Sequence, residues 1–264
     1  MNEFLATPFS EPYYFGLMTL TIFGIIFLRY LLVSGLYHFL FFRSFRQKVE
    51  QRIINETERP LQLVALEVWR SLITSLIFAL SGTVLLILWQ KGYTQIYLDW
   101  YYFPFWYLPL SLLIVLLIHE TYYYWLHRWM HQPKVYPWIH QWHHESVYTN
   151  SFTAFSFHPI ESILQALVIP VLVLFVPMHL SVLFVLLFIM TISGTINHAG
   201  IEVYPGKFNR HWLGKWIIGA THHDLHHKQS RFNFGLYFTF WDKWMQTESP
   251  KFDQLYEKYT ETQK

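Results

Sequence analysis

The chain has no cysteine among its 264 residues. Disulfide bonds, zinc ribbons and iron–sulfur clusters are therefore excluded, because each of them needs cysteine sulfur. Histidine and the carboxylates are the strong metal ligands that remain, so any metal site in this chain must be built from imidazole and carboxylate groups.

Charge is also scarce. Charged residues make up 14% of the chain, whereas soluble domains carry about 25%. Hydrophobic residues make up 53% and aromatic residues 20%, which indicates a membrane protein. The formal net charge of only +2 and the lack of a Lys/Arg-rich patch argue against a nucleic acid partner. The sequence has neither a GxGxxG nor a Walker motif, so we expect no nucleotide-binding fold.

Five apolar runs follow one another along the chain, at residues 15–42, 72–89, 108–126, 160–176 and 180–196. A transmembrane helix needs about 20 apolar residues, so the last two runs predict either a hairpin of two spans or a re-entrant pair. We expect an all-α integral membrane protein with about four to five transmembrane or re-entrant helices, forming one domain over residues 1–264.

The most charged stretch, residues 43–70, contains six Arg and Lys residues. The positive-inside rule places it in the cytoplasm. With the N-terminus outside and five crossings, the polar segments 133–159 and 200–264 would reach the same side and form a helical cap. We therefore expect a multi-pass protein of a bacterial inner membrane or the endoplasmic reticulum.

Histidines gather in three short clusters, which read HRWMH, HQWHH and HDLHH. They contain His127 and His131, then His140, His143 and His144, then His223, His226 and His227. Residues four apart lie on one face of a helix, and metal–nitrogen bonds are about 2.0–2.1 Å for a metal such as zinc. The imidazoles of one face can therefore converge on one ion. Together the three clusters can fill the coordination spheres of two metals, which predicts a binuclear site.

With its three clusters and the segments YYWLHRWMH, FHPIES, NHAG and NFG followed by WD, the chain resembles the fatty acid hydroxylase and sterol desaturase superfamily of membrane oxygenases. The run HRWMHQPKVYPWIHQWHH, followed by SFHPIE, is most similar to the sterol C-5 desaturase branch. The resemblance covers residues 120–244.

This resemblance implies two iron ions, O₂ as the oxidant and an external electron donor, either a cytochrome b-type protein or a ferredoxin with its reductase. The substrate would be a sterol or an acyl chain that enters from the bilayer and is oxidised at an unactivated C–H bond. Sterol C-5 desaturation is the first hypothesis, and hydroxylation of a fatty acyl chain or another lipid is the second. A non-catalytic, histidine-rich, metal-binding membrane protein is a third hypothesis from a different class.

Several residues outside the clusters complete the predicted site. The resemblance favours His198 as an additional ligand, with a hydrogen bond at the helix end as the alternative. Glu120, Asp224 and His158 are predicted to orient ligands, and the alternative for the two acids is a plain helix-terminal or solvated charge. Of the adjacent pair His222 and His223, we expect His223 to face the metal, because it keeps the cluster spacing.

Overall fold

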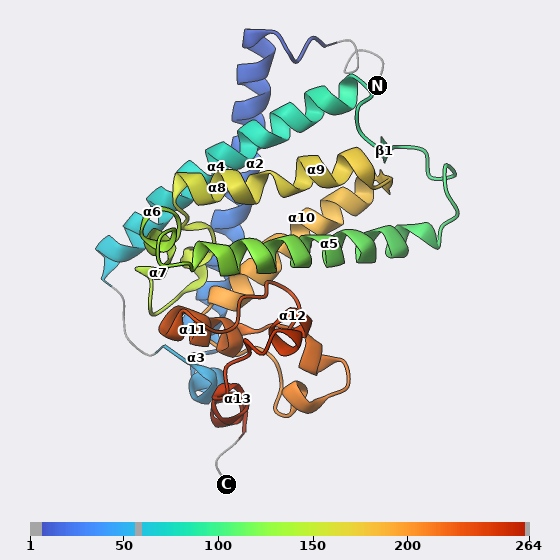
Figure 1. Cartoon of the computed structure of the whole chain (residues 1–264). Helices are drawn as coiled ribbons and strands as arrows, with labels where there is room; N and C mark the ends of the chain where they lie inside the picture. Colours follow the sequence, from blue (N-terminus) through green and yellow to red (C-terminus); the bar gives the residue numbers. More distant parts are fainter. Residues whose placement is uncertain (1–6, 56–59, 262–264) are drawn as a thin grey trace.

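The computed structural model describes residues 7–55 and 60–261, and α-helices dominate it. The long elements are α2 (Pro12–Phe39), which continues as the π-helical η1 (Leu40–Ser44), α4 (Leu61–Gln90), α5 (Tyr107–Met130), α8 (Pro159–Ala166), α9 (Val168–Phe175) and α10 (Leu180–His198). They run back and forth between two ends of a bundle (Figure 1). The all-α prediction is confirmed.

Within the part of the chain that the structure describes, three helices are long and apolar enough to cross a membrane. They are Pro12–Ser44, Leu61–Gln90 and Leu180–His198. Leucines on α2, such as Leu20 and Leu32, are more than half exposed although they are apolar. Such a surface fits a lipid environment. The expected count of four to five spans stays a prediction.

The fourth apolar run is broken into the two short helices α8 and α9. Pro170 explains the break, because proline has no N–H and its ring clashes with the carbonyl four residues earlier. That carbonyl belongs to Ala166, and it accepts a hydrogen bond of 3.1 Å from the Ser81 hydroxyl of α4 instead. After α9 the chain reaches the end of the bundle at which α5 begins. There β2 (Met178–His179) pairs in parallel with β1 (Ile96–Tyr97).

One boundary differs from the prediction. The second apolar run was expected to begin at residue 72, but α4 already begins at Leu61, inside the charged stretch 43–70. Glu67 and Arg70 are buried in its first turns. A buried charge needs partners. Arg70 has one inside the second histidine cluster, the carbonyl of Trp142, and Glu67 has one in the loop that follows the cluster, the hydroxyl of Ser146.

The remaining elements are short and collect at one end of the bundle, around the last turns of α2, α5 and α10 (Figure 1). They are α3 (Arg46–Val49), η2 (Glu50–Arg52), α6 (Tyr136–Ile139), α7 (Gln141–His144), η3 (Ser151–Phe155), η4 (Phe208–Arg210), η5 (Gly214–Trp216), α11 (Ala220–Gln229), α12 (Phe240–Trp244) and α13 (Phe252–Thr260). We call this end the cap. Tyr30 and Ser34 of α2 donate to the carbonyls of Phe152 and Ser151, at 2.9 and 2.8 Å, and so attach the cap to the bundle.

Candidate metal centre

Nine histidines from four parts of the chain meet inside the cap and form two groups. Group one consists of His127, His131, His140, His144 and His226, and group two of His143, His198, His223 and His227. In each group one nitrogen per imidazole lies within 4.8 Å of all the others. These are the nine histidines that the sequence analysis singled out as candidate ligands.

The two groups divide the clusters in a way that the spacing argument did not predict. In the second cluster His140 and His144 belong to group one, but His143 belongs to group two. In the third cluster His223 and His227 belong to group two, while His226 belongs to group one. Successive residues of an α-helix are rotated by about 100°, so position i+4 is turned about 40° from position i in one sense and i+3 about 60° in the opposite sense. Each of these two clusters therefore contributes imidazoles to both groups.

A turn between α11 and α12 fixes two imidazoles of group one. Nδ1 of His127 lies 2.9 Å from the carbonyl oxygen of Phe234, and Nδ1 of His226 lies 2.7 Å from that of Phe232. Asn233 stands between these carbonyls in the left-handed region, with φ of 62°. Its amide group donates to the carbonyl of His222 at 2.7 Å. The turn therefore aims two neighbouring carbonyls at two different histidines.

Group two contains a contact that tests whether a cation belongs here. Nδ1 of His143 lies 3.3 Å from the carbonyl of Ser156, and Nδ1 of His198 lies 2.7 Å from that of Gly194. A neutral imidazole that donates through Nδ1 has a bare lone pair at Nε2. Yet the two Nε2 atoms face each other at 3.1 Å. Two facing lone pairs repel unless a cation lies between them, so this donor set fits a metal ion.

Group one repeats this arrangement with a carboxylate as the outer partner. Nε2 of His127 lies 3.0 Å from Nε2 of His140. Nδ1 of His140 lies 2.9 Å from Oε2 of Glu161, at an angle that falls outside ordinary hydrogen-bond geometry. Both side chains of this ion-pair contact are fully buried. Metal-ligating histidines usually have such a partner on their second nitrogen.

Burial keeps the imidazoles of the centre neutral. It lowers the pKa of His144 to about 3 and that of His131 far below its ordinary value. For five further histidines, burial and then the neighbouring imidazoles lower the pKa well below the usual range. They are His140, His143, His223, His226 and His227. An imidazole must be neutral to bind a metal, so the environment provides the protonation state that a metal needs.

Glu120 has a different role from the expected bond to a ligating histidine. It is buried and accepts hydrogen bonds from the backbone N–H groups of Leu236, Tyr237 and Phe238, at 2.7–3.3 Å. Asp242 accepts from the N–H groups at the other end of the same turn, those of Phe234 and Gly235 at 2.9 Å. Glu120 therefore acts on the centre through the turn that holds His127.

Three other residues lie apart from the groups. Asp224 pairs with Lys228 at 2.7 Å and accepts from Asn55, so it faces away from the imidazoles that it was predicted to orient. His158 is the N-cap of α8, where its Nδ1 accepts from the N–H of Ile160 at 3.3 Å. His222 stands outside both groups, whereas His223 lies in group two.

The sequence analysis missed two buried acids that organise the centre, Glu161 and Glu67. Glu161 follows His158 inside FHPIES, and an acid at the start of an apolar run was the available signal. Glu67 is 2% exposed and accepts from side chains of the loop after the second cluster, those of Ser146, Asn150 and Thr153 at 2.6, 2.8 and 3.0 Å. Glu67 lies about 80 positions earlier, so no local pattern connects it with these partners.

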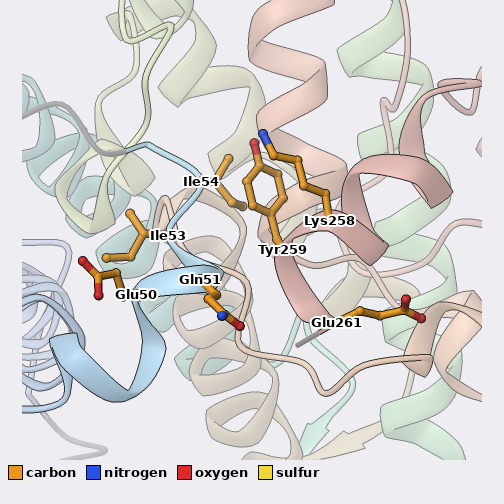
Figure 2. A pocket seen from close by; sticks show the side chains of 7 residues that line it. All are labelled: Glu50, Gln51, Ile53, Ile54, Lys258, Tyr259 and Glu261. Atoms are coloured by element: carbon orange, nitrogen blue, oxygen red, sulfur yellow. The ribbon is translucent and has the colours of Figure 1, made fainter. Parts of the chain in front are cut away.

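A pocket of about 470 Å³ lies between residues 50–54 and α13 (Figure 2). Charged and polar side chains such as Glu50, Lys258 and Glu261 surround its opening, together with Ile53 and Ile54. None of the nine histidines lines this pocket. The metal centre is therefore a separate and more deeply buried site.

Comparison with known protein families matches residues 112–247 to the family described as fatty acid hydroxylase, a stretch that contains all nine histidines. The chain belongs to the fatty acid hydroxylase family. Members of this family are iron-dependent oxygenases, so the chain is an oxidoreductase. This finding contradicts the non-catalytic alternative.

Curated relatives place this fatty acid hydroxylase family member beside the sterol C-5 desaturases. Human lathosterol oxidase is 28% identical over 232 residues, which cover 86% of this chain and 73% of that protein. The Delta(7)-sterol 5(6)-desaturase of Candida albicans is 26% identical over 215 residues, 79% of this chain and 52% of that protein. The Delta(7)-sterol-C5(6)-desaturase of Nicotiana tabacum is 34% identical over 139 residues, 50% of this chain and 46% of that protein. No solved structure matches the chain.

The resemblance to the sterol C-5 desaturase branch is thus confirmed. The chain spans about three quarters of the human relative and about half of the fungal and plant relatives. It is a membrane protein with apolar helices of spanning length and a histidine centre in its cap.

Proposed function

We propose that this chain is a membrane-bound sterol desaturase that introduces a double bond between carbons 5 and 6 of a sterol, using two iron ions, O₂ and an external electron donor. The observation that carries the proposal is the buried centre of nine neutral imidazoles, in which Nε2 atoms with bare lone pairs face each other at 3.0–3.1 Å. The names of the curated relatives support the sterol and the position of the new bond.

We assign one iron ion to each histidine group, with His127, His131, His140, His144 and His226 holding the first and His143, His198, His223 and His227 the second. Imidazole suits iron as well as zinc, and the family favours iron. When bound, iron supplies the redox chemistry that activates O₂ toward an unactivated C–H bond. The chain holds each imidazole neutral, fixes several through backbone carbonyls, and keeps bulk water from a centre in which eight of nine imidazoles are buried.

A lipid substrate is supported by the setting of the centre. A pocket of about 410 Å³ lies on α5 and is lined by Leu117, Ile118, Thr121 and Tyr122. Tyr122 precedes His127 by five residues, which is roughly 7–8 Å along a helix axis. An apolar substrate that leaves the bilayer along α5 would therefore arrive near the end of α5 that carries the first histidine cluster. The cap would face the cytoplasm, as the basic stretch 43–70 suggests.

Expression in a host that lacks its own sterol C-5 desaturase tests the proposal. Mass spectrometry of the sterols should show a product two mass units lighter than the precursor, with the new double bond at C5–C6. His144→Ala should abolish this product, and His211→Ala, which changes an exposed histidine outside both groups, should not. A host with unchanged sterols despite iron-loaded protein and a working reductase would refute the sterol assignment.

Hydroxylation of a fatty acyl chain or another lipid is the second candidate, and the description of the family favours it. The same extract distinguishes the two reactions. Hydroxylation adds one oxygen, so a lipid 16 mass units heavier would appear in place of the desaturated sterol.

A further inference from the structure

The metal centre approaches the surface of the cap at one edge. Eight of the nine histidines are buried, and only His131 of group one is half-buried. The ring of Tyr136 covers this edge, with its centroid 5.4 Å from that of His131 and 5.7 Å from that of His144. Tyr136 is itself half-buried and its hydroxyl interacts with the Ser230 side chain. A continuous path of aromatic and imidazole rings therefore leads from solvent to group one.

Two exposed cations lie close in the chain to the residues of this edge. Lys134 lies between His131 and Tyr136 in the chain, and Arg231 lies between Ser230 and Phe232, whose carbonyl holds His226. Neither cation has an ion-pair partner within residues 7–55 and 60–261. We call the surface formed by His131, Lys134, Tyr136 and Arg231 the entry face.

Two acids that follow histidines of the centre in the chain are already paired with cations. Glu145 follows His144 and lies 2.6 Å from Arg70. Asp224 of α11 lies 2.7 Å from Lys228. The entry face therefore keeps an excess of positive charge, and such a surface attracts and orients a partner of negative charge.

We propose that the entry face is the docking surface for an acidic one-electron carrier protein, whose electrons reach the centre through His131 and Tyr136. The inference rests on the proposed function. Forming one double bond removes two hydrogen atoms from the substrate, and reducing one O₂ to two waters needs two further electrons and two protons. Two successive encounters with a reduced one-electron carrier supply these electrons, and the protons come from solvent. The sequence has no nucleotide-binding motif with which it could bind a hydride-donating nucleotide directly.

Charge reversal at the entry face tests the proposal. The variant combines Lys134→Glu with Arg231→Glu. Its matched control combines Lys207→Glu with Lys215→Glu, which changes the net charge equally at two exposed positions of the loop 205–216. The probes are a soluble, acidic b-type cytochrome domain and, separately, an acidic [2Fe–2S] ferredoxin. We expect the entry-face variant to raise the KM for the reduced carrier on the order of 10-fold and to flatten its dependence on ionic strength, with the control close to wild type.

A binding measurement with metal-free protein gives a readout that does not depend on turnover. The Kd for the carrier should rise with the entry-face variant and not with the control. Tyr136→Leu should leave this Kd unchanged but slow electron transfer from the bound carrier, because it removes a ring from the path without changing a charge. A KM and Kd for both carriers that match wild type in the entry-face variant would overturn the proposal.

Two further outcomes separate this inference from its alternatives. With reduced methyl viologen in place of the carrier, wild type and variant should turn over equally. If even wild type forms no product with this reductant, the proposed function fails rather than the docking surface. If the variant instead loses affinity for vesicles of anionic phospholipid and keeps its affinity for the carriers, the entry face is a lipid-binding surface and the inference is wrong.

Discussion

Each histidine of the centre has two ring nitrogens with separate tasks, and in four of the nine a backbone carbonyl decides which one faces inward. In His127, His143, His198 and His226 a carbonyl oxygen lies within hydrogen-bonding distance of Nδ1. This contact fixes the tautomer and presents Nε2 to the centre. The centre is thus prepared before a metal arrives, and replacing one imidazole removes a donor that no neighbour can supply.

His198 is the most informative ligand to remove. Its Nε2 lies 3.1 Å from that of His143 and 3.0 Å from that of His223, so it stands in the middle of group two. We expect His198→Ala to lower activity as severely as His131→Ala or His227→Ala and to lower the iron content of the purified protein. The measurements are elemental analysis and product yield. A modest loss of activity with two ions retained would show that His198 is not a ligand and makes only a hydrogen bond at the helix end.

Glu161 acts on the centre through His140 alone. Outer partners of this kind typically contribute about 10–100-fold to metal affinity or activity. We therefore expect Glu161→Gln to lower iron affinity within that range, because the amide keeps the shape of the side chain but loses its charge. Glu145→Gln, at an exposed acid that pairs with Arg70, is the control. Equal iron affinities for wild type and Glu161→Gln would show that the contact with His140 is incidental.

The neutral imidazoles also predict how the stability of the metal-free protein depends on pH. Burial lowers the pKa of His144 from its ordinary value of 6.5 to about 3. Between these pH values the unfolded chain binds more protons than the folded chain, so the free energy of unfolding falls as the pH is lowered from about 6.5 toward 3. Unfolding of metal-free protein in detergent at pH 7.5 and 5.5 measures this loss. His144→Ala should reduce it, and a protein that is more stable at pH 5.5 would contradict the prediction.

At the scale of the element, the first turns of α4 hold the loop that carries the second histidine cluster. Glu67 accepts from three side chains of that loop, and Arg70 donates to the carbonyl of Trp142 at 2.9 Å and pairs with Glu145. A membrane helix thereby extends into the cap and positions His143 and His144 from outside their own segment.

The three hydrogen bonds that Glu67 accepts make it important for the stability of this loop. Glu67→Ala would leave two buried donors, Ser146 and Thr153, and the half-buried Asn150 without their acceptor. Each buried donor left unpaired costs about 1–3 kcal/mol. We expect a clear fall in the melting temperature together with a loss of iron, while Glu67→Gln keeps part of both because its amide oxygen still accepts. Thermal unfolding and elemental analysis measure the two effects. An unchanged melting temperature in Glu67→Ala would show that these hydrogen bonds do not stabilise the fold.

The elements show which parts of the fold a sequence reveals. The apolar runs at 15–42 and 180–196 predicted α2 and α10 within a few residues, because length and hydrophobicity are local properties. The run at 72–89 located α4 but missed its first eleven residues, because Glu67 and Arg70 have partners about 70–80 positions away. The break after Ala166 could have been predicted from Pro170. The hydrogen bond that the Ser81 hydroxyl donates to the carbonyl of Ala166 could not.

At the scale of the molecule, the long helices carry the chain between two ends (Figure 1). All nine histidines meet at one of these ends, in the cap. The chain has no cysteine, so single cysteines introduced at Arg52, Lys134 and Lys228 can be labelled cleanly from either side of the membrane. We expect all three to react from the cytoplasmic side. A cysteine at Lys91, which follows the end of α4, should react from the other side. Opposite labelling of the Lys134 and Lys228 positions would make a shared centre impossible.

The centre itself was predictable in membership but not in arrangement. Spacing and resemblance singled out the nine histidines, since both depend on residues close together in the chain. The assignment of His143 and His226 to the opposite group from their cluster neighbours follows from how α7 and α11 face each other, which is a tertiary property. The role of Asn233 and of the carbonyls beside it was likewise invisible, because backbone atoms carry no sequence signal.

The long reach of the histidine contacts has a consequence for biogenesis. His127 is fixed by a carbonyl 107 residues further on, and His131 meets His226 95 residues later. A chain is made from its N-terminus, so neither group can be complete before α11 has left the ribosome. A nascent chain that ends before residue 220 would carry only six of the nine imidazoles, four of group one and two of group two. If the centre binds iron as proposed, we expect both ions to be loaded only after the bundle and the cap have been made.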